Sequence, residues 1–517
     1  MPNYLAPGVY VEEVESGSRP IEGVGTAVAA FVGFAAQGPF NTPTLVTNWS
    51  QYSQVFGEFV PDCYLGHAVY GFFLNGGGAC YVVRIGGDRA NGAAGAGQSA
   101  IGPGPTATVG SYRVTARELP RGGGTPDDLT VEVTDAPEGA PEERFNLVVK
   151  RAGKVAETFE NVTTKRGKDN VVTAVREKSK LITLEETVPA AQLTRPSGGE
   201  VALTVPAPAT AAPTEVAADE YVGDAAERTG FGGLEAVEEV TMVAVPDLMG
   251  AYQRGAIDLE SVKAVQTAMI AHCELMGDRM AILDPPPGLS PQQVKEWRTD
   301  QAGYDSKYAA LYYPWIKIFD PASGINRYVP PSGHIGGIWA RNDNARGVHK
   351  APANETIRGA VALETQLTRG EQELLNPIGV NCLRTFPGRG ILVWGARTLS
   401  SDPAWRYLNV RRLFNYLEES ILAGTQWVVF EPNDDALWAR IRRTISAFLV
   451  MEWRRGALFG LTPDEAFFVK CDRETNPAES IDAGQVVCQI GIAPVKPAEF
   501  VVFQLAQMSG GTSLVSE

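Results

Sequence analysis

Two stretches of low complexity constrain the fold of this chain more than any other feature of its sequence. Residues 88–110 are rich in Gly and Ala, and residues 205–218 are mostly Pro, Ala and Thr, which are compositions typical of linkers. Between them lie short runs such as 129–133 and 145–149, in which apolar and polar residues alternate as in half-buried strands. The sequence therefore predicts an inserted, β-rich outer domain at 91–218 that is joined to its host by flexible linkers.

Both flanks of the insertion show short apolar runs that alternate with helical segments. After the insertion, for example, strands are expected at 240–245 and 280–283, with a helix at 261–277 between them. Alternation of strands and helices along a chain is the pattern of an α/β fold. We expect a middle α/β domain formed by residues 25–90 together with 219–375.

The last third of the chain, residues 376–517, reads as a further α/β domain. Apolar runs at 391–395 and 427–430 predict strands. A helix is expected to start at Asp402, which precedes a proline, and a second long helix is expected to end near Gly456. The fold class predicted for the whole chain is α/β with α+β mixing, in several domains.

Both ends of the chain carry a strand-like run without an obvious partner nearby. Residues 1–24 form an N-terminal arm whose strand is broken by Ser16–Pro20. Each run is either an edge strand of its own domain or a strand donated to a neighbouring subunit by strand addition. The residues expected to pair are Val9, Tyr10, Val11, Glu12 and Val14 at the start, and Phe500, Val501, Val502, Phe503 and Leu505 at the end.

Composition excludes several classes of protein. The net charge of −15 argues against a nucleic-acid binder, which normally carries a basic face. The 6 cysteines include no CxxC pair, so neither a disulfide scaffold nor a zinc site is expected. The N-terminus lacks the profile of a signal peptide, and its most apolar window is too short to span a bilayer. We therefore expect a chain that is made and folded in the cytoplasm and does not insert into a membrane.

Candidate catalytic residues are few. Asp247, Asp284 and Asp320 follow apolar strands, where α/β enzymes place catalytic or metal-binding acids. Each is adjacent to a proline, however, which suits a turn that ends a strand. The 4 histidines show no metal-ligand spacing, and no phosphate-binding motif is present. No cofactor, metal or catalytic residue is predicted, and a structural protein is favoured over an enzyme.

One basic cluster is conspicuous in this acidic chain. It comprises Arg440, Arg442, Arg443, Arg454 and Arg455 and lies on and just after the second long helix of the last third. The cluster is either a solvated face with intrahelical ion pairs or a surface that docks on an acidic partner.

Several segments resemble the sheath proteins of contractile phage tails and of phage-tail-like contractile injection systems. The resemblance covers residues 1–90 and 220–510, and it is weaker in the insertion. The matching segments are APGVYVEE (6–13), FVG (31–33), NGGG (75–78), YVVR (81–84), NPIGVN (376–381), GILVWGARTL (390–399), YLNVRR (407–412), WVVFEPN (427–433) and GALFG (456–460).

The resemblance implies a subunit of a helical sheath made of stacked six-subunit rings around an inner tube. It implies that both terminal arms reach into neighbouring subunits and complete a shared sheet. It also implies contraction that drives the tube through a target envelope, with baseplate and terminator or cap proteins as further partners. The C-terminal domain would face the tube, with the basic cluster as a candidate tube-facing surface, and the insertion would face outward. Assembly would take place in the cytoplasm, in a phage tail or a particle released on lysis.

Two alternatives stay open at this point. A cytoplasmic α/β enzyme would use the strand-end aspartates, and a non-contractile tail protein of the terminator kind would form closed rings rather than tubes.

Overall fold

The structure, a computed structural model, describes residues 20–86 and 216–504 without a break, together with stretches between 106 and 203. A nine-stranded sheet is the centre of the molecule, and strands β3, β1, β11, β12, β13 and β18 run parallel within it. In spatial order the strands are β16 (Glu355–Thr356), β19 (Gly390–Val393), β18 (Val380–Phe386), β13 (Ala309–Tyr313), β12 (Met280–Leu283), β11 (Met242–Ala244), β1 (Val28–Gly33), β3 (Ala79–Arg84) and β2 (Thr44–Val46).

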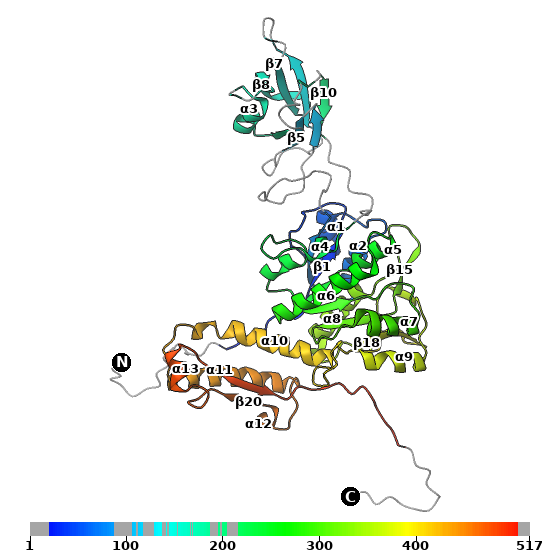
Figure 1. Ribbon diagram of the computed structural model, residues 1–517, viewed down its shortest axis with the longest axis vertical. Helices are drawn as coiled ribbons and strands as arrows, with labels where there is room; N and C mark the ends of the chain where they lie inside the picture. Colours follow the sequence, from blue (N-terminus) through cyan, green and yellow to red (C-terminus); the bar gives the residue numbers. More distant parts are fainter. Residues whose placement is uncertain are drawn as a thin grey trace, which may run out of the picture.

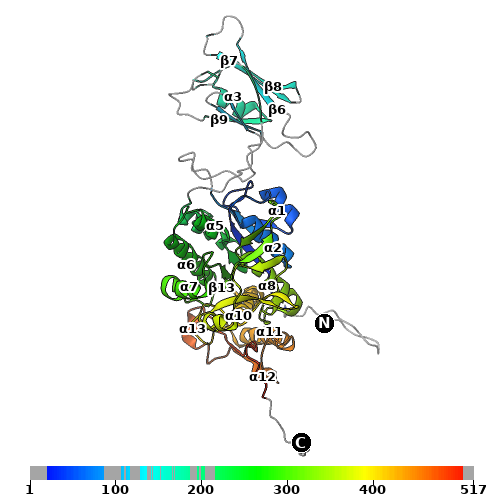
Figure 2. The same ribbon diagram turned by 90° about the vertical axis from the view of Figure 1, so that its right-hand side faces the viewer.

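Helices cover both faces of this sheet, as a parallel sheet requires. Figure 2 shows α2 (Leu65–Leu74) and α8 (Ser332–Arg346) on one side, and α5 (Asp247–Gln253) and α6 (Leu259–Met276) on the other. The first pair approaches closely because α8 carries glycine at the contact: a Cβ on Gly333 would lie 2.3 Å from Ala68 Cα. The prediction of an α/β fold is confirmed.

Shorter elements complete this central domain. They are α1 (Trp49–Phe56), α4 (Ala218–Val222), η3 (Gly232–Ala236), α7 (Pro291–Glu296), η4 (Trp297–Ala302), α9 (Arg369–Leu375) and η5 (Asn376–Ile378). A separate three-stranded sheet is formed by β15 (Asn326–Val329), β14 (Ile316–Phe319) and β17 (Ala360–Leu363).

The insertion is rich in β structure and has its own apolar core, separate from that of the central domain. One sheet holds β10 (Gly199–Ala202), β6 (Leu129–Asp135), β7 (Arg144–Arg151) and β8 (Lys154–Thr163), and the other holds β4 (Thr106–Val109), β5 (Tyr112–Ala116) and β9 (Ile182–Glu186). A helix, α3 (Val171–Lys178), packs against β8 and β9. Alternate residues of β6 and β7 are buried, as their sequence pattern indicates.

The C-terminal region is built on two long helices, α10 (Leu408–Gly424) and α11 (Asp435–Arg454), which Figure 1 shows side by side below the central sheet. The smaller elements α12 (Pro463–Ala466), β20 (Phe467–Lys470), α13 (Ala478–Asp482) and β21 (Gln489–Ile492) follow. A distinct apolar core lies between these elements.

Three expectations for this region are wrong. Strands β18 and β19 belong to the central sheet, so a domain boundary at 376 would separate them from the strand β13 with which β18 pairs. The first helix starts at Leu408 rather than Asp402, because the Asp402 carboxylate accepts a bond from Ala404 N and closes a turn. Residues 427–430 form no strand: η6 (Gln426–Val428) is a 3-10 turn and Phe430 is fully exposed.

Candidate assembly interface

The chain enters the body through residues 20–27, named here the N-terminal root. Ile21 is only 2% exposed and packs into the C-terminal core with Leu413 and Leu417 of α10. The fit is close, since a Cβ on Gly424 would lie 2.7 Å from Ile21 Cγ1. The backbone N–H of Val24 donates to Ser420 Oγ at 3.1 Å. The N-terminal root is therefore part of the C-terminal core.

A buried ion pair joins the same root to the central domain. Arg412 of α10 donates to both carboxylate oxygens of Asp343 on α8, at 2.9 and 2.6 Å, and the two side chains are 3% and 2% exposed. Arg412 also donates to the carbonyl of Thr26 at 3.1 Å, and the Thr26 hydroxyl donates to Asp343 at 2.7 Å. Charge-assisted bonds of this kind are among the stronger ones in proteins. Root, α8 and α10 are thus fixed to one another.

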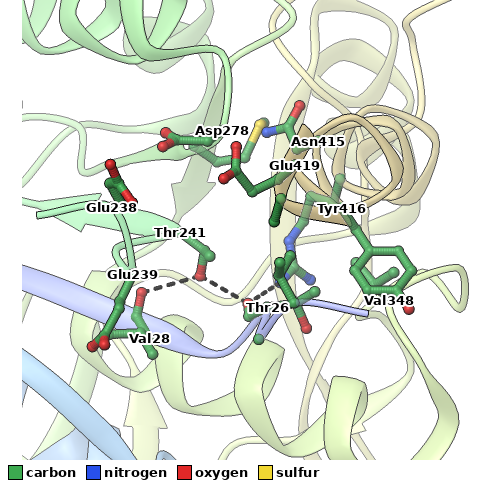
Figure 3. Close-up of a pocket in the computed structure, with 15 residues that line it drawn as sticks. Thr26, Val28, Glu238, Glu239, Thr241, Asp278, Val348, Asn415, Tyr416 and Glu419 are labelled. Atoms are coloured by element: carbon green, nitrogen blue, oxygen red, sulfur yellow. Dashed lines mark hydrogen bonds between the residues drawn. The ribbon is translucent and has the colours of Figure 1, made fainter. Parts of the chain in front are cut away.

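An acidic cavity of about 410 Å³ opens beside the N-terminal root (Figure 3). Glu238, Glu239, Asp278 and Glu419 contribute carboxylates to its wall. Burial, then the charges of Asp278 and Glu238, raise the pKa of Glu419. Within the described ranges no group of three His, Cys, Asp or Glu side chains is placed to hold a metal ion. The cavity therefore offers negative charge without a metal site.

The chain leaves the body through residues 493–499, named here the C-terminal root. Glu499 accepts bonds from Arg397 Nε at 2.9 Å and Nη2 at 2.6 Å, from Asn376 Nδ2 at 2.9 Å, and from the Tyr407 hydroxyl at 3.4 Å. Burial opposes ionisation of this carboxyl, but the bonds from Arg397 and Asn376 outweigh it and lower the pKa of Glu499. We call this arrangement the Glu499 clamp.

Beyond the clamp, the described part of the chain is exposed. Phe500, Val501, Val502 and Phe503 are 74%, 67%, 79% and 84% exposed, and residues 500–504 have no regular secondary structure. Four consecutive exposed apolar side chains are unusual on a soluble surface and mark a site of interaction. Their pairing stays a prediction, while Leu505 and the predicted N-terminal residues Val9, Tyr10, Val11, Glu12 and Val14 lie outside the described residues.

The two-stranded sheet β20–β21 has no third strand beside it in the described part of the chain, and an isolated bridge joins Leu458 to Pro494 just after β21. Its strands are antiparallel, from Phe467↔Ile492 to Lys470↔Gln489, and no further strand pairs with them in the described part of the chain. Phe468 is 58% exposed, and Ile490 is 37% exposed. Two strands alone are a marginal sheet, and open edges are templates for further pairing. The outer edges of β20 and β21 are therefore candidates for further pairing.

Comparison with known proteins identifies the chain. Two family models match in succession, the phage tail sheath protein central domain at residues 226–399 and the phage tail sheath C-terminal domain at residues 400–507. Together they take in more than half of the chain. The chain belongs to the tail sheath family.

Individual sheath proteins match it to different extents. The tail sheath protein of Burkholderia phage BcepMu is 25% identical over 97% of this chain and 96% of its own length. The tail sheath protein of Vibrio phage KVP40 is 27% identical over 43% of this chain, and the match spans only 34% of that protein. The anti-feeding prophage helical sheath in its contracted state is 25% identical, with a TM-score of 0.58 over 97% of this chain and 99% of that one.

The strand-end aspartates of this sheath protein hold the backbone together. Asp247 is fully buried and accepts bonds from the backbone N–H groups of Phe34, Tyr64 and Leu65. Asp284 accepts a bond from Ser332 N at 3.0 Å. Burial raises the pKa of Asp247 to about 6 and that of Asp284 to about 7. Neither lines the acidic cavity beside the N-terminal root, and both satisfy buried N–H groups.

The predicted basic cluster is divided between several environments. Arg440 pairs with Glu431 at 2.8 Å, Arg455 pairs with Glu452 at 2.7 Å, and Arg442 donates to the carbonyl of Cys471. Arg443 and Arg454 are exposed.

No helix in the described ranges is long and apolar enough to cross a membrane.

The Glu499 clamp and the N-terminal root were not predicted from sequence. Arg397 lies inside the GILVWGARTL segment that carries the family resemblance, which is the only signal that could have drawn attention to it. Its partner is 102 residues away in sequence.

Proposed function

We propose that this chain is the structural subunit of a contractile sheath, which polymerises helically around an inner tube and contracts to drive that tube through a target envelope. The observation that carries the proposal is the exposed apolar run 500–503, which projects from a chain that also has a two-stranded sheet with open edges. The full-length likeness to a helical sheath in a contracted state supports it.

Subunits are joined by exchange of arms. The run Phe500–Phe503 of one subunit adds to an edge of β20–β21 in a second, and the strand at Val9–Val14 of a third adds to the other edge. Such contacts are heterologous, and heterologous contacts that do not close produce helical filaments. Backbone hydrogen bonds in the shared sheet keep subunits connected while their bodies rotate during contraction.

The remaining partners follow from the sheath role. The C-terminal region faces an inner tube protein, with the exposed Arg443 and Arg454 as the tube-facing residues of the original basic cluster. The insertion faces outward, and baseplate and terminator proteins hold the two ends of the polymer. The chain has no catalytic role, and the particle assembles inside the producing cell.

Electron microscopy of the purified full chain tests this function. We expect striated hollow cylinders under negative stain, whereas closed rings would indicate a terminator and persistent monomers at high concentration would refute the proposal. Deletion of residues 1–18 is expected to leave a folded chain that does not polymerise. The matched control is Leu275→Asp, which alters an exposed apolar side chain on α6 and is expected to polymerise normally.

A further inference from the structure

The Glu499 clamp is the last attachment of the chain before the exposed run. The side chains of Arg397 and Glu499 are 10% and 21% exposed, and three residues converge on a single carboxylate. For residues 500–504 no hydrogen bond to the body is recorded within the described part of the chain. The position of Glu499 therefore determines where the C-terminal arm, residues 500–517, departs.

We propose that the Glu499 clamp positions the C-terminal arm for exchange by fixing its departure point to the central sheet. This inference rests on the proposed sheath function.

Arg397 is itself fixed to the central sheet. Its backbone N–H donates to Asn381 Oδ1 at 2.7 Å, and Asn381 Nδ2 donates back to the Arg397 carbonyl at 2.8 Å. Asn381 is fully buried in β18. Two residues further on, Leu399 N donates to the carbonyl of Ala309 in β13. A force on the arm therefore passes through Glu499 and Arg397 to β18 and β13.

Just before the clamp, the C-terminal root is held by the C-terminal region instead. Val495 N donates to the Ala457 carbonyl at 3.3 Å, and Asn409 Nδ2 donates to the Val495 carbonyl at 3.1 Å. Between Val495 and Glu499 the chain thus crosses from one body to the other. Without the clamp, the arm would be attached only to the C-terminal region, at Val495.

The expected size of the effect follows from chain entropy. Freeing residues 496–499 adds only four residues to the C-terminal arm, and this alone lowers its effective concentration at an acceptor by less than about twofold. Ordering each freed residue again on binding is the larger effect, at roughly fivefold or more per residue. If one freed residue is ordered again in the polymer, loss of the clamp should weaken assembly by about tenfold, and ordering more of residues 496–499 should weaken it further.

The test compares Glu499→Gln with Lys496→Gln in the full chain. Both variants remove one charge from the same root, but Lys496 is exposed and does not belong to the clamp. We expect melting temperatures that differ by no more than about 2 °C between the two monomers. We also expect faster hydrogen exchange at 496–499 only in Glu499→Gln, and a critical concentration for polymerisation raised about tenfold or more only in Glu499→Gln. Glu499→Asp, which keeps the negative charge, should polymerise at a lower critical concentration than Glu499→Gln.

The outcomes separate the clamp from the sheath function. If the wild-type chain does not polymerise, the proposed function fails, and the hydrogen exchange of the monomers still decides whether the clamp holds the root. If Glu499→Gln exchanges like Lys496→Gln, or if it polymerises at the same concentration as the wild type, the clamp proposal is overturned.

Discussion

At the N-terminal root, Ile21 is buried in the C-terminal core beside an ion pair that is almost inaccessible to water, whereas at the C-terminal root one partly exposed carboxylate holds the chain. The first arrangement resembles a domain interior and the second a surface contact. The N-terminal root should therefore be part of what makes the subunit fold, and the C-terminal root part of what makes folded subunits assemble.

The largest expected effect breaks the N-terminal root. Asp343→Ala leaves the Arg412 guanidinium buried without its carboxylate, and loss of one partner of a buried pair costs about 3–5 kcal/mol of folding free energy. Chemical unfolding of the full chain measures this. The control is Glu373→Ala, which removes the exposed ion pair with Arg369 and should leave the unfolding midpoint unchanged.

Removal of the carboxylate at the C-terminal root should lower the free energy of unfolding much less than Asp343→Ala does. Because the Glu499 side chain is partly exposed, Glu499→Gln should lower the free energy of unfolding by only about 1 kcal/mol or less. Equal destabilisation by Asp343→Ala and Glu499→Gln would contradict the distinction between the two roots.

The smallest expected effect is a difference between the two roots in how their stability depends on pH. The pKa of Glu419 is raised beside the N-terminal root, so the native state binds the extra proton, and stability there falls as pH rises from about 4.5 through the raised pKa. The pKa of Glu499 is lowered, so its contribution is fully present above about 4.5 and is lost as pH falls through the lowered pKa.

Hydrogen exchange of the two roots, corrected for the intrinsic pH dependence of exchange, tests this difference. Acidification below pH 4.5 should increase the corrected hydrogen-exchange rate at residues 496–499 but not at residues 20–27. Glu419→Gln should remove the pH dependence at the N-terminal root, and a root that loosens equally in that variant and in the wild type would contradict the assignment to Glu419.

Local features of the sequence predicted most of the fold. Alternating runs identified the β-rich insertion and the α/β flanks, and the second long helix, α11, ends at Arg454, close to the predicted Gly456. The strand predicted at 427–430 was wrong because apolar composition alone cannot distinguish a buried strand from an exposed turn. Phe430 adopts a left-handed backbone, with φ of 67°, that interrupts any strand.

The interface was harder to predict for a different reason. Val24 and Ser420 are 396 residues apart, and Arg397 and Glu499 are 102 apart. No local periodicity encodes such contacts, because they depend on how the completed domains pack. The exposed run Phe500–Phe503 was recognisable only because an apolar stretch without a nearby partner is visible in the sequence itself.

The most direct test of arm exchange is photo-cross-linking from the arm in assembled polymer. A photoreactive phenylalanine analogue replaces Val502, the polymer is assembled from an equal mixture of nitrogen-14 and nitrogen-15 chains, and cross-linked peptides are identified by mass spectrometry. We predict cross-links from residue 502 to β20 or β21 that contain one light and one heavy peptide. Cross-links within one chain only, or cross-links to the central domain, would contradict the exchange of arms between subunits.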